Sequence, residues 1–379
     1  MIGTIEVIGY LILFALWLIP AIVVPSLPVG PLLVATSTVI VLLGSIRSLH
    51  LIDDDTTKDA NGKSTSSSSS SVEKEILSAS DAYRFPIVGG IALCSLYVAF
   101  KYFKDQAAIL LSIYFAFVGV FTLSSTLSPI FSKFISGKKV YGFKKKFPLI
   151  GDVDALFSFA DFIALILSSI FSYYYITEKK NKYHFLMNNV LGVSFCIQSL
   201  ERISIGSYKV GAILLCGLFF YDIFFVFGTD IMVTVAKNVD GPIKLLFPRK
   251  LQQGLYPLSD DDKGEFSLLG LGDIVIPGLF VALLLRFDFV RAGLKNSSQK
   301  LSQSFPMPYF IVNIISYALG LVTTVAVMVF FKQAQPALLY LVPACLLGSL
   351  AVGLARSEFA PLFAYDEEAT EKDKKKKDK

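Results

Sequence analysis

Residues 210–229 read VGAILLCGLFFYDIFFVFGT, a largely apolar run in which Asp222 is the only charge. About 20 apolar residues are the length that a helix needs to cross a bilayer. A lone carboxylate inside such a run is costly, by roughly 2.5–3.5 kcal/mol on insertion scales. The run therefore predicts a transmembrane helix whose Asp222 faces the interior of a helix bundle or a water-filled cavity.

Similar apolar segments recur along the whole chain of 379 residues, of which 54% are hydrophobic and only 17% are charged. Lipid offers no partners for backbone polar groups, so each spanning segment must be helical. The sequence thus predicts an all-α, polytopic transmembrane helix bundle. Its ten apolar segments cover residues 7–25, 30–46, 86–103, 107–131, 155–177, 185–200, 210–229, 267–285, 308–331 and 335–355.

The chain divides into four parts by composition. The first apolar segment is either a signal sequence or an extra helix, since it ends at a Pro-Ser-Leu-Pro break but lacks the basic start of a signal peptide. A serine-rich stretch cannot bury a core and predicts a cytosolic loop. The four parts are the N-terminal apolar segment 1–27, the N-terminal helices 28–205 with the Ser-rich loop at 53–81, the helices 206–356, and a Lys-rich tail 357–379.

Lys and Arg are distributed unevenly between the two ends of the predicted helices. With a cytosolic C-terminus, 24 of the 35 basic residues fall in cytosolic loops and in the tail, as the positive-inside rule favours. The excess of basic residues, a net charge of +5, is thus explained by membrane orientation. We therefore expect no nucleic-acid partner. In this orientation the sequon at Asn296 faces the cytosol, so we expect it to carry no glycan.

The tail closes with Lys376-Lys377-Asp378-Lys379. Lys376 and Lys377 resemble a dilysine retrieval signal, which predicts residence in the endoplasmic reticulum membrane; a solvated lysine run is the alternative interpretation. The four cysteines lie inside apolar segments and the two histidines lie far apart, so we expect no disulfide framework, no metal and no cofactor. We interpret Asp161 as a headgroup-region residue, and the three carboxylates at 260–262 as a solvated loop.

A second isolated carboxylate, Asp273, lies in the stretch LGLGDIV at 269–275. If the helices 210–229 and 267–285 are antiparallel neighbours, both carboxylates lie about 10 Å below the lumenal edge. Two level carboxylates in a low-dielectric site are expected to share one proton, as in aspartic proteases. The same pair could instead carry ions or protons through a transporter, or form a structural polar contact, and the carboxylates alone do not separate these alternatives.

Residues beside the two aspartates add weak signals. Gly270 and Gly272 let a backbone approach Asp273, although glycines also serve simple helix packing. Tyr221 either donates a hydrogen bond to the site or fills space in the bundle. Pro336 lacks an N–H and so deprives the carbonyl four residues earlier of a helical partner, or it merely starts the last helix.

Three short motifs in this order resemble those of the signal peptide peptidase and presenilin family. They are Tyr221-Asp222, Gly270-Leu271-Gly272-Asp273 and Gln335-Pro336-Ala337-Leu338, which match the family's YD, GxGD and PAL motifs. Each is weak alone, but the three together on separate apolar helices are highly specific. The predicted orientation is that of the signal-peptide-peptidase branch, because presenilins have the opposite one.

The resemblance implies an intramembrane aspartyl endopeptidase with nine transmembrane helices, to which the first apolar segment is an addition. Asp222 and Asp273 would be catalytic, and the other residues of the three motifs would bind substrate or shape the site. The implied partners are transmembrane peptides in type II orientation, namely remnant signal peptides and tail-anchored or misfolded membrane proteins, together with further copies of the chain. Because a helical substrate must unwind, we expect Gly272 and the segment around Pro336 to present backbone groups to it, as in β-augmentation.

Overall fold

The computed structural model describes ten stretches of the chain, and every structural statement below refers to these residues. They are 2–22, 29–58, 75–134, 140–147, 151–179, 184–239, 241–248, 266–293, 305–331 and 335–367.

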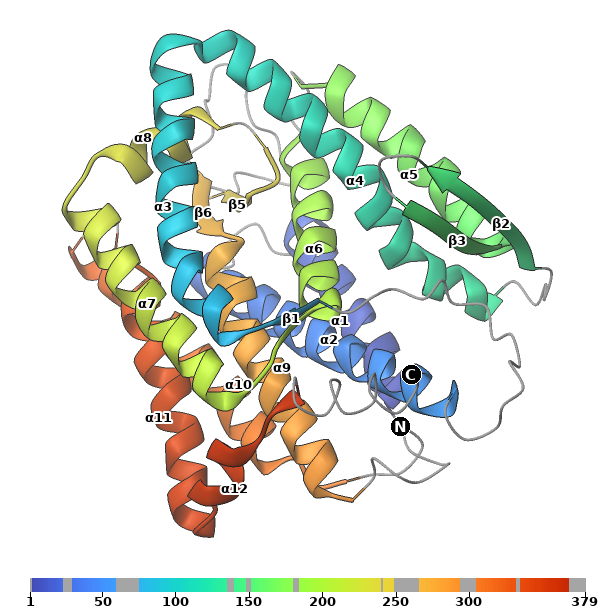
Figure 1. The fold of residues 1–379 in the computed structure, drawn as a ribbon. Coiled ribbons are helices and arrows are strands. Elements are labelled where there is room, and N and C mark those ends of the chain that lie inside the picture. Colours follow the sequence, from blue (N-terminus) through green and yellow to red (C-terminus); the bar gives the residue numbers. More distant parts are fainter. Residues whose placement is uncertain are drawn as a thin grey trace.

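Ten long helices form a single bundle, and two short helices lie at its edges (Figure 1). The predicted polytopic helical architecture is confirmed. The short helices are α8 (Ile231–Asn238) and α12 (Phe359–Ala364). The long helices are α1 (Ile2–Ile22), α2 (Val29–Lys58), α3 (Ala79–Tyr102), α4 (Lys104–Phe134), α5 (Phe159–Thr177), α6 (His184–Arg202), α7 (Tyr208–Phe227), α9 (Gly272–Arg291), α10 (Pro308–Phe331) and α11 (Leu338–Arg356).

Seven of the described helices are long and apolar enough to cross a membrane: α2, α3, α4, α5, α7, α10 and α11. Helices α6 and α9 are of similar length but carry more polar side chains, including two aspartates and two arginines in α9. These polar side chains lie inside the bundle or at its ends, so they do not require contact with lipid.

The centre of the bundle is α9, which contacts α2, α6, α7, α10 and α11. Every residue from Pro277 to Phe289 is buried. At Gly278 a Cβ atom would lie 2.8 Å from a methyl carbon of Leu200, so a larger residue here would force Leu200 to shift. The helix that carries Asp273 is therefore held by neighbours on all sides.

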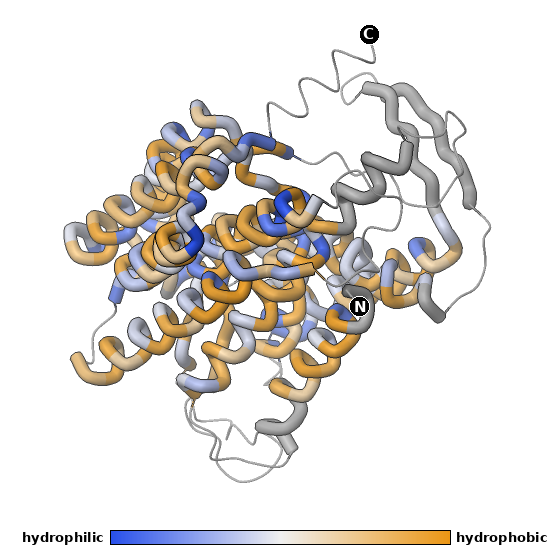
Figure 2. The backbone as a smooth tube through the Cα atoms, turned by 90° about the horizontal axis from the view of Figure 1, so that it is seen from below, coloured by the Kyte–Doolittle hydropathy of each residue, from blue (hydrophilic) through white to orange (hydrophobic). Residues whose placement is uncertain are grey.

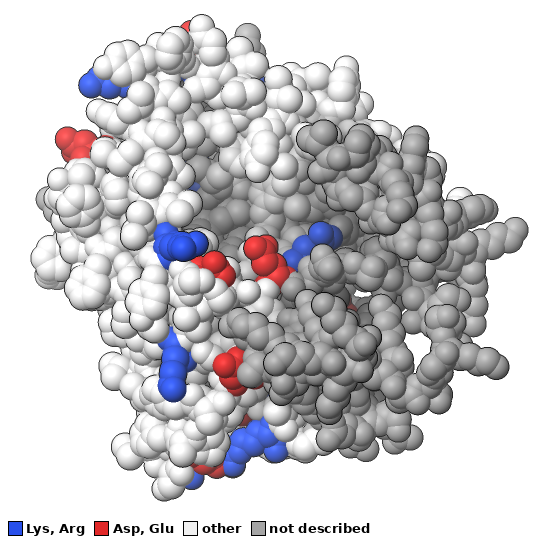
Figure 3. Space-filling view, in the orientation of Figure 1, with Lys and Arg blue, Asp and Glu red and all other residues white. Residues whose placement is uncertain are grey.

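The outer face of the bundle is apolar, as a lipid-facing surface must be. Hydrophobic residues dominate the long helices in Figure 2, and in Figure 3 charged side chains are sparse on the face in view. Helix α3 is the extreme case, because Ala82 and Phe100 are its only buried residues.

Three short two-stranded sheets accompany the helices. Their strands lie at the ends of helices, where backbone groups need partners outside the helical ladder. The pairs are β1 (Glu75–Leu77) with β4 (Ile203–Ile205), parallel; β2 (Val140–Phe147) with β3 (Gly151–Ser158), antiparallel; and β5 (Lys244–Pro248) with β6 (Phe266–Gly270), antiparallel.

Two predicted boundaries were wrong. The helix predicted over 267–285 begins only at Gly272, because residues 266–270 form strand β6 instead. The loop predicted at 53–81 is shorter, since α2 continues to Lys58 and α3 begins after a capping box formed by Ser78 and Asp81. The serine run at 64–71 lies outside the described residues.

The first part of the predicted tail 357–379 packs on the bundle, up to Glu367. The Glu367 N–H donates to the carbonyl of Gly206 across 2.7 Å, and the Glu367 carboxylate pairs with Nε of the fully buried Arg286, also at 2.7 Å. Glu367 therefore joins the start of α7 to α9. Lys376 and Lys377 lie outside the described residues, as does Asn296.

The N-terminal helix α1 packs against α2. The Tyr10 hydroxyl accepts a 2.8 Å hydrogen bond from Nη1 of Arg47, which is 4% exposed. Arg47 also pairs with Glu201 of α6 at 2.8 Å. Residues 1–27 were predicted to be either a signal sequence or an extra helix. The packing of α1 resembles that of a helix that belongs to the bundle.

Candidate active site

Asp222 lies on α7, which begins after an N-cap Ser207 whose hydroxyl accepts from the Val210 N–H. The Asp222 side chain is buried, and its Oδ2 accepts a 3.0 Å hydrogen bond from the Leu338 N–H. Leu338 is the first residue of α11, where a backbone N–H has no partner within the helix. Asp222 thus caps the last long helix from a neighbouring one, and the helix dipole favours its negative charge.

Asp273 is the second residue of α9, the helix adjacent to α7. Its carboxylate accepts a hydrogen bond from the Gly270 N–H, and it lies close enough to Asp222 for the two charges to interact. From α10, the buried Tyr317 hydroxyl donates a long, 3.5 Å hydrogen bond to the Asp273 carbonyl. The structure therefore brings together the two aspartates that the sequence analysis singled out.

The two glycines before Asp273 differ in their surroundings. A Cβ atom on Gly270 would lie 3.2 Å from Oδ2 of Asp273, whereas one on Gly272 would meet only Ile276 at 3.8 Å. Between them, the Leu271 N–H donates to the carbonyl of Ile243 across 3.0 Å. Gly270 is the glycine that lets the Asp273 carboxylate lie against the backbone.

Of the two roles considered for Pro336, the structure favours the start of the last helix. Pro336 precedes α11 by two residues and lies outside both α10 and α11, so it interrupts neither helix. The Ala337 carbonyl accepts from the N–H groups of Tyr340 and Leu341, and Oε1 of Gln335 accepts from the Tyr340 hydroxyl at 3.4 Å. The segment fixes the start of α11 beside Asp222.

Tyr221 packs between α7 and α3 instead of donating to the site. Its ring lies 4.6 Å from that of Phe225, centre to centre, and it faces Gly89 and Gly90 of α3. Within the described part of the chain its hydroxyl makes no hydrogen bond. Of the two roles considered for Tyr221, the structure favours packing.

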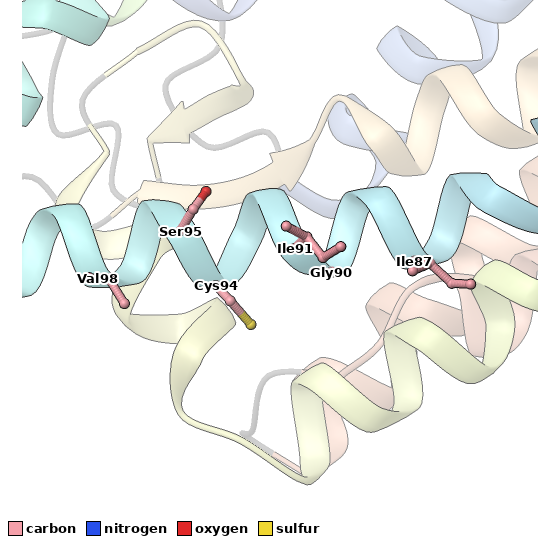
Figure 4. Close-up of a pocket in the computed structure, with 6 residues that line it drawn as sticks. All are labelled: Ile87, Gly90, Ile91, Cys94, Ser95 and Val98. Atoms are coloured by element: carbon pink, nitrogen blue, oxygen red, sulfur yellow. The ribbon is translucent and has the colours of Figure 1, made fainter.

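An apolar depression of about 620 Å³ lies along α3 on this side of the bundle. Figure 4 shows the side chains that line it, all of them from α3. Gly90 is shared between this depression and the contact with Tyr221, so the depression borders the helix that carries Asp222. Its lining residues are Ile87, Gly90, Ile91, Cys94, Ser95 and Val98.

Strand β6 leads directly into Asp273, and its partner β5 is held by a helix. Nδ2 of Asn188 donates to the Lys244 carbonyl, and the Asn189 amide bonds both the N–H and the carbonyl of Leu246. These two asparagines are not among the predicted site residues. The available signal was a pair of adjacent amides inside the apolar segment 185–200, since polar residues within a membrane are usually functional or paired.

Other candidate residues lie away from this site. Asp161 forms a capping box with Ser158 at the start of α5 and accepts a hydrogen bond from Ser128. Among the described residues, no three His, Cys, Asp or Glu side chains gather as a metal site. The three carboxylates at 260–262 lie outside the described residues.

The geometry suits acid–base chemistry on water. Two carboxylates interact in a largely buried site, and each is oriented by one backbone N–H. A pair that holds a single proton offers one base and one acid at the same place. That is the requirement for adding water to a peptide carbonyl without a metal or a covalent intermediate.

Comparisons with known proteins agree with this chemistry. A family model described as signal peptide peptidase matches residues 67–369, a range that contains both aspartates and the Pro336 segment. The chain is 38% identical over 360 residues to a mouse signal peptide peptidase, covering 90% of this chain and 85% of the relative. It is 37% identical to the human one, covering 90% and 86%, and 46% identical over 209 residues to an intramembrane protease of Caenorhabditis elegans, covering 55% and 43%.

Proposed function

Because the chain belongs to the signal peptide peptidase family, it is an intramembrane aspartyl protease, and we propose that Asp222 and Asp273 are its catalytic pair. The observation that carries the assignment is their placement on adjacent helices, with interacting charges and one backbone donor each. Family membership also favours proteolysis over the transport of ions or protons through the same pair.

The proposed reaction uses both protonation states of the pair. The carboxylate takes a proton from water as the water oxygen attacks the scissile carbonyl carbon, and the carboxylic acid protonates the carbonyl oxygen. The resulting gem-diol collapses when the amide nitrogen receives a proton and the C–N bond breaks. One gem-diol hydroxyl returns its proton to the pair, which leaves a carboxylic acid and an amine as products.

The substrate must reach the pair as an extended strand, because a helix covers its own peptide bonds. We place that strand on β6, whose one edge pairs with β5 and whose other edge has no partner strand among the described residues. β6 ends three residues before Asp273, and Gly272 is exposed between them. The Leu338 N–H already donates to Asp222, so it is not available to the substrate. We therefore assign the backbone hydrogen bonds with the substrate to β6, and the Pro336 segment only sets where α11 begins.

The depression on α3 supports lateral entry of that substrate from the membrane. It is apolar, it lies on the membrane-spanning helix with the smallest buried share, and it adjoins Tyr221, the neighbour of Asp222. An apolar transmembrane segment can lie in such a depression without leaving a lipid-like environment.

The cellular setting is a further part of the proposal. The distribution of basic residues supports a cytosolic C-terminus and substrates in type II orientation, such as remnant signal peptides and tail-anchored or misfolded membrane proteins. Lys376 and Lys377 support retrieval to the endoplasmic reticulum, and the family resemblance suggests homo-oligomers. Absence of glycan on Asn296 in cells is the expected result for this orientation, and its presence would overturn it.

Cleavage by the purified protein tests the catalytic assignment. The wild type, Asp222→Ala and Asp273→Ala are incubated in detergent with a signal-peptide substrate, beside Asp230→Ala as a control. Asp230 is an exposed aspartate just beyond α7 that makes no capping hydrogen bond. We expect cleavage by the wild type and by Asp230→Ala only. Full activity of either active-site variant, or no cleavage of several substrates by any of the four proteins, contradicts the proposal.

A further inference from the structure

Asn188 and Asn189 lie one turn into α6, and both side chains are only 3% exposed. A buried amide without hydrogen bonds is costly, so a buried pair of amides in an apolar helix needs partners. Their partners are backbone groups of β5, 56 and 57 residues away in sequence. The two side chains therefore join a transmembrane helix to a strand.

The Asn189 amide makes the two hydrogen bonds to Leu246 that a neighbouring strand would otherwise make. Its Nδ2 donates to the Leu246 carbonyl and its Oδ1 accepts from the Leu246 N–H, both at 2.8 Å. Asn188 adds a third bond at 2.8 Å to the carbonyl of Lys244, two residues earlier on the same edge of β5. A carboxamide suits this role because its donor nitrogen and acceptor oxygen lie side by side. An ionised carboxylate can only accept, and a hydroxyl has a single oxygen for both bonds.

These bonds fix β5 along its outer edge, and β5 in turn fixes β6. Leu246 pairs with Leu268, and Lys244 pairs with Gly270. The Gly270 N–H holds the carboxylate of Asp273. Figure 1 shows β5 and β6 in the space between α3 and α6, and α6 contacts β5 directly. The path from the two asparagines to Asp273 therefore runs through the paired strands β5 and β6.

We propose that Asn188 and Asn189 are positioning residues that hold the β5–β6 sheet in one register relative to Asp273 and so decide which substrate bond is cleaved. The inference rests on the proposed function, in which the substrate strand pairs with β6. Strand pairing repeats every two residues, so a strand that slips by two keeps its side chains on the same faces. A loosened sheet should therefore present bonds two residues away from the normal one.

The test compares Asn188→Leu and Asn189→Leu with the wild type in the full-length protein. Leucine keeps the branched shape and the number of heavy atoms of asparagine, and it removes one hydrogen bond at position 188 and two at position 189. Ser194→Ala is the matched control, because Ser194 is buried on the same helix but bonds only its own helix, at the Val190 carbonyl. Product masses from one defined transmembrane substrate give the cleaved bonds, and hydrogen exchange gives the protection of the Leu246 N–H.

For Asn189→Leu we expect faster exchange at Leu246, additional products displaced by two residues, and roughly tenfold lower kcat, the equivalent of one or two lost hydrogen bonds. Asn188→Leu should show the same product pattern more weakly, and Ser194→Ala should match the wild type. Unchanged exchange at Leu246 or an unchanged product pattern overturns the inference. If Asn189→Leu fails to fold, Asn188→Leu decides by the same readouts. Failure of the proposed function looks different, because the wild type itself then cleaves nothing while the exchange result still stands.

Discussion

The Leu338 N–H donates a 3.0 Å hydrogen bond to Oδ2 of Asp222, across 116 residues of sequence. This bond joins the start of α11 to α7 within the buried part of the bundle. The bond explains why the Pro336 segment lies beside the aspartates. The segment precedes α11, and the unpaired N–H groups at the start of this helix lie next to a carboxylate. Asp222 consequently has a structural role that is separable from catalysis.

Replacing Asp222 by alanine should therefore lower stability as well as activity. The lost cap is expected to cost about 0.5–2 kcal/mol and to speed hydrogen exchange at Leu338. Asp222→Asn keeps a side-chain oxygen for this N–H, so it should recover most of the stability while remaining inactive. Thermal unfolding with hydrogen exchange measures the first effect, and substrate cleavage measures the second. Equal stability of the alanine variant and the wild type would show that the bond contributes nothing.

Alanine at the two glycines of the GxGD motif should act differently. At Gly270 the new methyl group lies 3.2 Å from Oδ2 of Asp273 and must displace this carboxylate by a few tenths of an ångström. We expect kcat to fall about tenfold or more for Gly270→Ala, because catalysis is sensitive to misplacement on this scale.

Gly272→Ala is the matched variant, since its methyl group meets only Ile276 at an ordinary 3.8 Å. Here kcat should change less, and any effect should fall on KM because Gly272 is exposed beside the proposed substrate strand. Steady-state kinetics on one substrate separates the two outcomes. The interpretation of the geometry is wrong if Gly272→Ala lowers kcat more than Gly270→Ala does.

The ion pair between Arg286 and Glu367 should be a large stabilising contact. Removing one partner of a buried pair typically costs about 3–5 kcal/mol, because it leaves the other charge buried and unpaired. We expect Glu367→Ala to lower the unfolding free energy in this range, since the Arg286 guanidinium is fully buried.

Arg356→Ala provides the comparison for this pair. Arg356 lies 3.6 Å from Glu358 and is 41% exposed, and exposed pairs contribute about 0–1 kcal/mol. Denaturation of the detergent-solubilised variants gives both values. Similar losses for Glu367→Ala and Arg356→Ala would mean that the segment up to Glu367 does not hold the ends of α7 and α9 together.

The parts of the fold that depend on the cost of charge in a membrane were predictable from the sequence. Asp222 and Asp273 stand out because no other charge lies near them in their apolar runs. Strand β6 was not predictable, because the apolar sequence FSLLG continues into α9, and a short apolar run does not distinguish strand from helix. Its identity depends on β5, on Asn189 and on a chain reversal that local sequence does not encode.

The docking of Glu367 was missed for a related reason. Its acidic neighbourhood and the following lysines are typical of a solvated tail. Its partner, Arg286, lies 81 residues earlier, directly after the predicted apolar segment 267–285. Long-range ion pairs of this kind leave no periodic signal in the sequence.

The packing of α1 leads to a last prediction, that residues 1–27 stay with the mature protein. A signal sequence that is removed needs no specific contacts with the bundle. Instead, Tyr10 accepts a hydrogen bond from the buried Arg47, and at Gly9 a Cβ atom would lie 2.4 Å from a methyl carbon of Leu43. Mass spectrometry of the purified chain should recover peptides from α1, and Gly9→Leu should destabilise the protein by overpacking, by about 1–3 kcal/mol. A mature N-terminus near residue 28, in protein of full activity, would show that these contacts are not used.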